Sequence, residues 1–131
     1  MDDRQAILAR LHRLGELVFA RDPAVVDEMW NEAGFSLYGS EAGEQATTRD
    51  QLGRLFAGLF ALPFRICWQW DEPSVTVAGD IAWLAADGKL ELTHADRVER
   101  QPYRLVAIFH RIGGAWNWRL YSGSEPAATR D

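Results

Sequence analysis

Apolar residues recur along the chain with two different periods, and the change between them falls near Pro63. Before that residue, apolar positions lie three or four apart, which is the spacing along one face of a helix. From Phe64 onward, apolar and polar residues alternate, as they do along the strands of a sheet. The pattern therefore predicts an α+β fold, in which helices pack on one face of a bent, mostly antiparallel sheet.

Three helices are expected in the N-terminal half. The first begins at a cap residue, Asp2 or Asp3, and runs to about Ala20. The pair Asp22-Pro23 starts a second, short helix, which is expected to end near Gly34. The first helix carries one apolar stripe, made of Ile7, Leu11, Leu14 and Val18.

The third helix opens at Thr48, because Thr followed three residues later by Gln51 is typical of a capping box. Pro63 ends it. Its apolar stripe, which should face the sheet, consists of Leu52, Leu55, Phe56, Leu59 and Phe60.

Strands account for most of the remaining sequence. Phe35 to Tyr38 forms a short strand, and longer strands begin at Phe64 and Ile81. The pair Asp87-Gly88 fits either a hairpin turn or a bulge within one long strand. The polar segment from Thr93 to Arg100 is expected to be a loop.

The last long segment, from Tyr103 to Ser124, reads as two strands joined at Gly113-Gly114, a pair that supplies the positive φ of a hairpin turn. If Ile112 opposes Ala115, three pairs follow on one face of the sheet. The predicted pairs are Phe109 with Trp118, Ala107 with Leu120, and Leu105 with Ser122.

Composition excludes several classes of function. The net charge of −5 and the scattered basic residues argue against a nucleic-acid or anionic-membrane surface. Cys67 is the only cysteine, so no internal disulfide can form, and no group of Cys and His has the spacing of a metal site. The sequence shows neither a signal peptide nor a membrane span, so a cytoplasmic protein is expected. No cofactor is expected.

Four motifs carry a resemblance to a known family. They are Arg21-Asp22-Pro23 followed by Trp30, the segment from Thr48 to Leu52, the segment from Val75 to Trp83, and the hairpin from Phe109 to Trp116. Their order resembles the nuclear transport factor 2-like superfamily and, within it, the SnoaL-like branch. The hairpin is also similar to the association domain of calcium/calmodulin-dependent kinase II. The resemblance covers nearly the whole chain and implies one domain spanning residues 1–131.

The resemblance implies a cone, in which a strongly bent sheet wraps the three helices and leaves a pocket between them. It also implies a homodimer through the convex face of the sheet, which here carries Val106, Ile108 and His110. This pairing would explain why both faces of the last strands are apolar. The ketosteroid isomerase branch needs an Asp base and two oxyanion donors, and the matching positions hold residues that cannot serve: Leu14, Leu37 or Tyr38, and Leu105.

A pocket is expected between the third helix and the concave face of the sheet. The small side chains of Ala107 and Ser122 should leave room for a guest among larger neighbours. Because Tyr103 and Ser122 offer the only hydroxyls on that face, the ligand should be mainly apolar with one or two polar groups. The predicted ligand-binding residues are Trp30, Phe35, Phe56, Phe60, Tyr103, Leu105, Phe109, Trp118, Leu120 and Ser122.

Two functions fit these features. The first is a small-molecule-binding domain without chemistry, which the missing catalytic groups favour. The alternative is an enzyme of the polyketide cyclase, isomerase or dehydratase type that acts on a small cyclic metabolite. A carboxylate or His facing Tyr103 in the pocket would favour the enzyme. His94 lies beside Asp96 in a segment interpreted as a solvated loop, and no residue is assigned a catalytic role.

Overall fold

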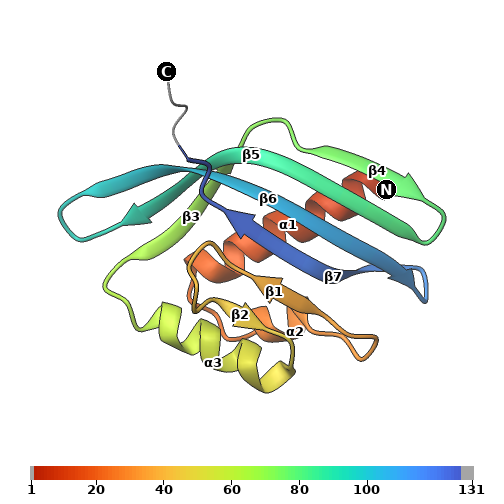
Figure 1. The fold of residues 1–131 in the computed structure, drawn as a ribbon, viewed down its shortest axis with the longest axis horizontal. Helices are drawn as coiled ribbons and strands as arrows, with labels where there is room; N and C mark the ends of the chain where they lie inside the picture. Colours follow the sequence, from red (N-terminus) through yellow and green to blue (C-terminus); the bar gives the residue numbers. More distant parts are fainter. Residues whose placement is uncertain (1, 128–131) are drawn as a thin grey trace.

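The computed structural model describes residues 2–127 as three helices and a curled, unclosed sheet (Figure 1). The helices are α1 (Asp3–Phe19), α2 (Val25–Met29) and α3 (Arg49–Phe60). The strands are β1 (Ser36–Tyr38), β2 (Gln45–Ala46), β3 (Arg65–Trp70), β4 (Ser74–Ala78), β5 (Ile81–Thr93), β6 (Val98–Ile112) and β7 (Ala115–Ser124). The predicted α+β class is confirmed.

The seven strands form one sheet in the order β2-β1-β7-β6-β5-β3, and β4 also pairs with β5. Only the β1–β7 pair is parallel among the described strands. The helices lie on the concave side, with α1 crossing the sheet and α3 below its β1–β2 edge (Figure 1). The concave side therefore holds the core, and no helix or strand of residues 2–127 covers the opposite side of the sheet.

The first helix follows its predicted pattern. Asp2 accepts a hydrogen bond from the Gln5 backbone N–H at 2.7 Å, and the Gln5 side chain accepts one from the Asp2 N–H at 3.2 Å. This reciprocal capping box fixes the start of α1. The predicted stripe is buried, and Leu17 joins it.

The second helix is shorter than predicted, since α2 ends at Met29 and Trp30 already has an extended backbone. Asn31 supplies the physical reason. Its side-chain oxygen accepts from the Ala33 N–H at 3.1 Å, and its amide donates to the Trp118 carbonyl at 2.6 Å. An Asn that bonds its own backbone two residues on favours a turn over continued helix.

Strands β5 and β6 are longer than the sequence pattern indicated. β5 continues through Asp87-Gly88 with an unbroken register, so this pair is neither a turn nor a bulge. The glycine is needed for close approach, because a Cβ on Gly88 would lie 2.1 Å from the Gln69 carbonyl oxygen on β3. The loop expected from Thr93 to Arg100 is also shorter, since β6 begins at Val98.

The predicted register of the final hairpin is correct near the turn and wrong beyond it. Gly113 and Gly114 adopt positive φ and Phe109 opposes Trp118, as predicted. Beyond that pair Ile108 opposes Leu120, so Arg119 is an extra residue that bulges from β7. A bulge reverses the facing of every later residue. Leu120 and Ser122 therefore lie on the outer face, whereas Tyr121 and Gly123 face the helices.

No helix in residues 2–127 is both long and apolar enough to cross a membrane.

Candidate functional site

The centre of the predicted pocket is solidly packed. Leu105, Phe109 and Trp118 are each 0 % exposed, and the ring centroids of Phe109 and Trp118 lie 4.5 Å apart. Ala107 is equally buried, so its small side chain leaves no open space. The predicted opposition of Ala107 to Leu120 and of Leu105 to Ser122 is wrong, for the reason given by the bulge. The part of the concave face around Leu105, Phe109 and Trp118 is called the packed end below.

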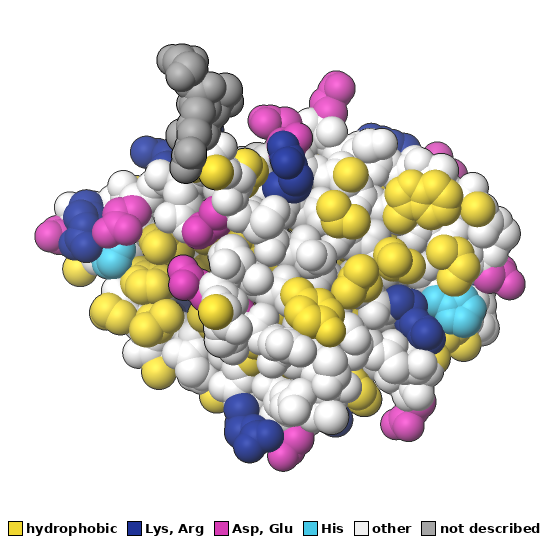
Figure 2. All heavy atoms as spheres, viewed as in Figure 1, with side chains coloured by type: hydrophobic (Ala, Val, Ile, Leu, Met, Phe, Trp, Pro, Cys, Tyr) yellow, Lys and Arg dark blue, Asp and Glu magenta, His cyan; other side chains and the backbone are white. Residues whose placement is uncertain are grey.

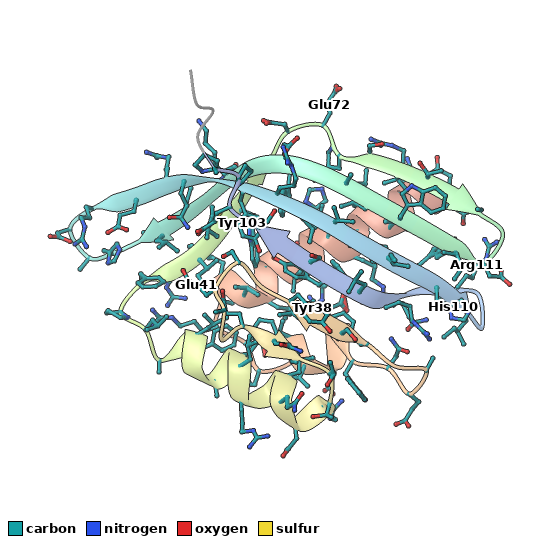
Figure 3. The ribbon with its side chains drawn as sticks, in the orientation of Figure 1. Tyr38, Glu41, Glu72, Tyr103, His110 and Arg111 are labelled. Atoms are coloured by element: carbon teal, nitrogen blue, oxygen red, sulfur yellow. The ribbon has the colours of Figure 1, made fainter. Side chains whose placement is uncertain are left out.

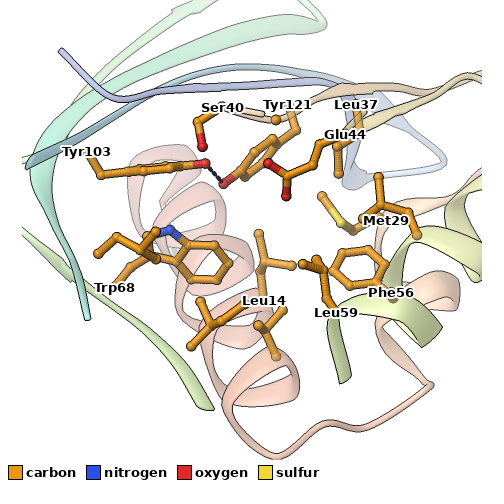
Figure 4. A pocket seen from close by; sticks show the side chains of 15 residues that line it. Leu14, Met29, Leu37, Ser40, Glu44, Phe56, Leu59, Trp68, Tyr103 and Tyr121 are labelled. Atoms are coloured by element: carbon orange, nitrogen blue, oxygen red, sulfur yellow. Dashed lines mark hydrogen bonds between the residues drawn. The ribbon is translucent and has the colours of Figure 1, made fainter. Parts of the chain in front are cut away.

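The cavity lies nearer the other end of β6, where α1, α3 and β3 approach the ends of β6 and β7 (Figure 4). The space among its side chains amounts to about 520 Å³, including the part that opens to solvent. This region is called the open end. Its lining residues are Leu14, Val18, Met29, Leu37, Gly39, Ser40, Glu44, Leu55, Phe56, Leu59, Ile66, Trp68, Leu90, Tyr103 and Tyr121.

Two of the ten predicted ligand-binding residues, Phe56 and Tyr103, line this cavity. Phe60 contacts Phe56, with ring centroids 5.7 Å apart, but is not in the lining. Phe35 is buried and Trp30 partly buried, both outside the lining. Ligand binding by any of these residues stays a prediction.

Tyr103 and Tyr121 form the polar roof of the cavity. Their hydroxyl oxygens lie 2.6 Å apart, which is hydrogen-bond distance (Figure 4). The Tyr103 ring reaches across Gly123, where a Cβ would lie only 1.9 Å from the hydroxyl oxygen. Gly123 thus acts as a positioning residue for the pair. Figure 3 shows Tyr103 far along the sheet from His110 and Arg111, which lie beside the β6–β7 hairpin.

Burial keeps both tyrosines in the neutral form. It raises the pKa of Tyr103 to about 12 and the pKa of Tyr121 well above its usual value. One hydroxyl of the pair donates to the other, so one O–H remains free to donate to a guest. The pair can therefore bind a ligand oxygen without itself ionising.

Trp68 presents a second donor at the same end. Among residues 2–127 its buried indole N–H has no partner at full hydrogen-bond geometry, although it lies close enough to the Tyr103 hydroxyl to lower the pKa of that group slightly. The ring centroids of Trp68 and Tyr103 lie 6.2 Å apart. The nitrogen edge of the indole points toward the tyrosine hydroxyls (Figure 4). A buried donor without a partner costs free energy, and a ligand acceptor would remove that cost.

Glu44 supplies the only formal charge among the residues that line the cavity. It belongs to the loop between β1 and β2, which is closed by a hydrogen bond from the Gly39 N–H to the Glu44 carbonyl at 2.6 Å. One carboxyl oxygen, Oε1, accepts from the Glu41 N–H at 2.8 Å. The carboxyl group points into the cavity beneath Tyr121 (Figure 4).

The environment of Glu44 disfavours its negative charge. Partial burial raises the pKa of its carboxyl group, and the nearby carboxylates of Glu41 and Glu125 act in the same direction. The hydrogen bond from the Glu41 N–H opposes this effect. A carboxyl with a raised pKa beside neutral hydroxyls can accept a proton from a ligand or donate one to it.

The cavity opens toward α3. Glu44, Leu55 and Leu59 line both the cavity and a shallower groove outside it, which also contains Gln51 and Arg54. Glu44 therefore stands between the interior and the entrance. No pattern in the sequence marks Glu44. The predicted constant register of the hairpin leaves Tyr121 off the pocket face, whereas the bulge turns it toward the helices.

The sequence matches a known protein family over most of its length. The SnoaL-like domain family matches residues 7–128. The chain belongs to this family. No curated protein matches the sequence.

Solved structures share the fold of this SnoaL-like domain at low sequence identity. One named as a candidate dehydratase of the NTF2-like family, from Streptomyces avermitilis, has a TM-score of 0.81 and 15% identity, over 95% of this chain and 96% of that one. One named as a candidate aromatic ring hydroxylase, from Novosphingobium aromaticivorans, has a TM-score of 0.82 and 20% identity, over 96% and 90%. One named as a candidate calcium/calmodulin-dependent kinase II association domain, from Xanthomonas campestris, has a TM-score of 0.80 and 14% identity, over 98% and 91%. At these identities the likeness shows the fold alone.

His94 lies outside the cavity of the SnoaL-like domain. Its side chain is only 14 % exposed, with its ring 5.1 Å from that of Phe64 and its Nε2 atom 3.3 Å from a Glu99 carboxyl oxygen. His94 does lie in the loop between β5 and β6, as expected, but the expectation that its side chain is solvated is wrong. Within residues 2–127, no three His, Cys, Asp or Glu residues are grouped as a metal site requires.

Proposed function

We propose that this SnoaL-like domain binds a small, mainly apolar molecule in the cavity of the open end. The observation that carries the proposal is the distribution of chemistry along the lining. Aliphatic and aromatic side chains form most of the wall, whereas Tyr103, Tyr121, Trp68 and Glu44 bring their polar atoms to one side. Sites of this kind bury the apolar body of a ligand and orient it with a few polar contacts.

Filling the cavity tests the proposal. Benzyl alcohol serves as a neutral probe, and its binding is followed by calorimetry or ligand-observed NMR. Leu59→Trp, within the lining, should abolish binding. Leu62→Trp makes the same change on an exposed residue just beyond α3 and should leave binding intact. Equal binding by both variants would refute the proposal, and so would failure of the wild type to bind any of benzyl alcohol, benzylamine and benzoate at millimolar concentration.

A second candidate function is catalysis of proton transfer, which Glu44 favours. Its carboxylate could take the proton from a C–H bond next to a carbonyl group, while a tyrosine hydroxyl donates a hydrogen bond to the developing enolate oxygen. The proton then returns to a different carbon or is exchanged with water. This chemistry suits the cyclase, isomerase and dehydratase types that the family resemblance implies.

Deuterium exchange tests this second candidate without knowledge of the substrate. In D₂O, the wild type should accelerate exchange of the protons next to the carbonyl of cyclohexanone, as measured by NMR. Glu44→Gln should abolish the acceleration, and Glu41→Gln should preserve it because the Glu41 side chain is exposed and outside the lining. An acceleration that survives Glu44→Gln would exclude Glu44 as the base.

We also propose that two copies pair through the outer face of the sheet. Hydrophobic side chains form a broken band across this face (Figure 2). Trp83 and Val106 are each 44 % exposed, Tyr38 is 42 % and Ile81 is 40 %. An isologous contact between two such bands would hide apolar surface that is otherwise wet.

Sedimentation tests the pairing. Val106→Asp should give monomers, because it buries a charge in the proposed interface. Val77→Asp is the matched control. Val77 is 38 % exposed but opposes Ala82, which faces the helices, so Val77 lies on the concave side, outside the proposed interface. A wild-type protein that sediments as a monomer at micromolar concentration would contradict the pairing.

A further inference from the structure

The carboxylate of Glu44 has no cation to balance it. None of the ion pairs within residues 2–127 includes Glu44, and no Lys, Arg or His lines the cavity. Arg54 lines the groove outside the cavity, and its side chain pairs with Asp50, one turn earlier on α3. The Nη2 atom of Arg54 lies 3.9 Å from Oδ2 of Asp50. A partly buried carboxylate without a counter-ion is costly, and a ligand cation would offset that cost.

The acceptors around this carboxylate suit an ammonium group. Oε1 of Glu44 is occupied by the Glu41 N–H, while Oε2 has no hydrogen-bond partner among the described residues. The Ser40 side chain and the paired hydroxyl of Tyr121 offer further oxygen lone pairs in the same lining. An ammonium nitrogen carries three donors and no acceptor, so it can use several of these oxygens at once.

The remaining walls also favour a cation. Phe56, Trp68, Tyr103 and Tyr121 present aromatic rings to the cavity, and the faces of such rings attract positive charge. The carboxylates of Glu41 and Glu125 are close enough to act on Glu44, so they add negative potential around its carboxyl group. An anionic ligand would meet this potential with no cationic side chain in the lining to compensate.

We infer that the molecule bound in this cavity is a small primary amine with an apolar body, whose ammonium group pairs with Glu44. This inference rests on the proposed binding function and names the class of ligand. It does not depend on the proton-transfer candidate, because a Glu44 carboxylate held by an ammonium group is not free to act as a base.

Three probes of matched shape test the inference by calorimetry: benzylamine, benzyl alcohol and benzoate. Because a hydrogen bond to a charged group contributes more than a neutral one, the wild type should bind benzylamine at least about tenfold more tightly than benzyl alcohol. Benzoate should bind more weakly than either. Glu44→Gln should reduce the affinity for benzylamine to about that for benzyl alcohol, and Glu41→Gln should retain most of the preference.

The outcomes separate this inference from the proposed function. Equal affinity of the wild type for benzylamine and benzyl alcohol, or an amine preference that survives Glu44→Gln, overturns the amine inference. If benzyl alcohol still binds in those cases and Leu59→Trp prevents it, the proposed binding function stands. Failure of all three probes to bind the wild type overturns both. Thermal unfolding of Glu44→Gln shows whether the variant is folded, and Glu44→Asp is a second variant that keeps the charge and should keep the amine preference in part.

Discussion

The two ends of the concave sheet face each hold a tryptophan whose indole nitrogen is buried and has no partner at full hydrogen-bond geometry among residues 2–127. At the packed end, Trp118 is 0 % exposed and lies between Phe109 and Tyr121, with ring centroids 4.5 and 6.2 Å away. At the open end, Trp68 is partly buried and borders the cavity. The same side-chain type thus completes a core in one place and lines a cavity in the other.

The difference follows from what stands beside each indole. The packed end is filled by large side chains of β6 and β7, among them Phe109 and Trp118. At the open end, Gly88 opposes Tyr103 in the sheet and Gly123 lies under the Tyr103 ring, so neither adds a side chain. The loop that carries Glu44 then brings polar atoms to the unfilled volume. Space and convergent polar groups, rather than aromatic content alone, mark the candidate site.

Truncation of the two tryptophans should separate the ends most strongly. Trp118→Ala is expected to lower the free energy of unfolding by about 3–5 kcal/mol, because it leaves a cavity inside a filled core. Trp68→Ala should cost roughly half as much or less, since one side of its ring already faces open space. Urea denaturation measures both changes. Equal losses would show that the open end is packed like the other.

Alkaline pH should lower the free energy of unfolding through the buried Tyr103 of the open end. Burial raises the pKa of Tyr103 to about 12, so the folded protein resists an ionisation that the unfolded chain undergoes near pH 10. The stabilisation is fully present below pH 10 and is lost as the pH rises toward 12. A two-unit shift corresponds to about 2–3 kcal/mol for this one group. Unfolding measured from pH 9 to 12 should show a smaller decline in Tyr103→Phe, and an unchanged decline would contradict the assignment.

Gly123→Ala should have a smaller effect that is specific to the tyrosine pair. The added methyl would collide with the Tyr103 hydroxyl and push it from Tyr121, at a cost of about 1–3 kcal/mol. In a Tyr103→Leu background the collision is absent, so the same change should cost much less. This double-mutant cycle isolates the contact. Additive losses would mean that Gly123 does not position Tyr103.

Much of the fold follows from local pattern. The stripe from Ile7 to Val18, the cap and the turn at Gly113-Gly114 are all set by neighbouring residues, and each prediction is confirmed. Of the two candidate caps, Asp2 and Asp3, the structure has Asp2. The loop expected up to Arg100 was wrong because its charged residues lie on a hairpin that projects into solvent. There, cross-strand pairs such as Arg100 with Glu91 at 2.8 Å replace apolar alternation.

The site was harder to predict for a physical reason. One bulged residue, Arg119, reverses the facing of β7, and the alternation of side chains carries no mark of it. Phe56 and Tyr103 do line the cavity, since neither lies on the part of β7 that the bulge reverses. Glu44 was missed because its role depends on how a loop folds back over the cavity. The spacing of apolar residues along the chain does not indicate such a contact.

The indole N–H resonances of Trp68 and Trp118 test the central claim most directly. They can be assigned in a ¹H–¹⁵N spectrum with the variants Trp68→Phe and Trp118→Phe, and then followed during a titration with benzyl alcohol. If the open end is the binding site, the Trp68 signal should shift to saturation while the Trp118 signal stays in place, and Leu59→Trp should suppress the shift. A Trp68 signal that does not move, or equal shifts at both indoles, would contradict the account.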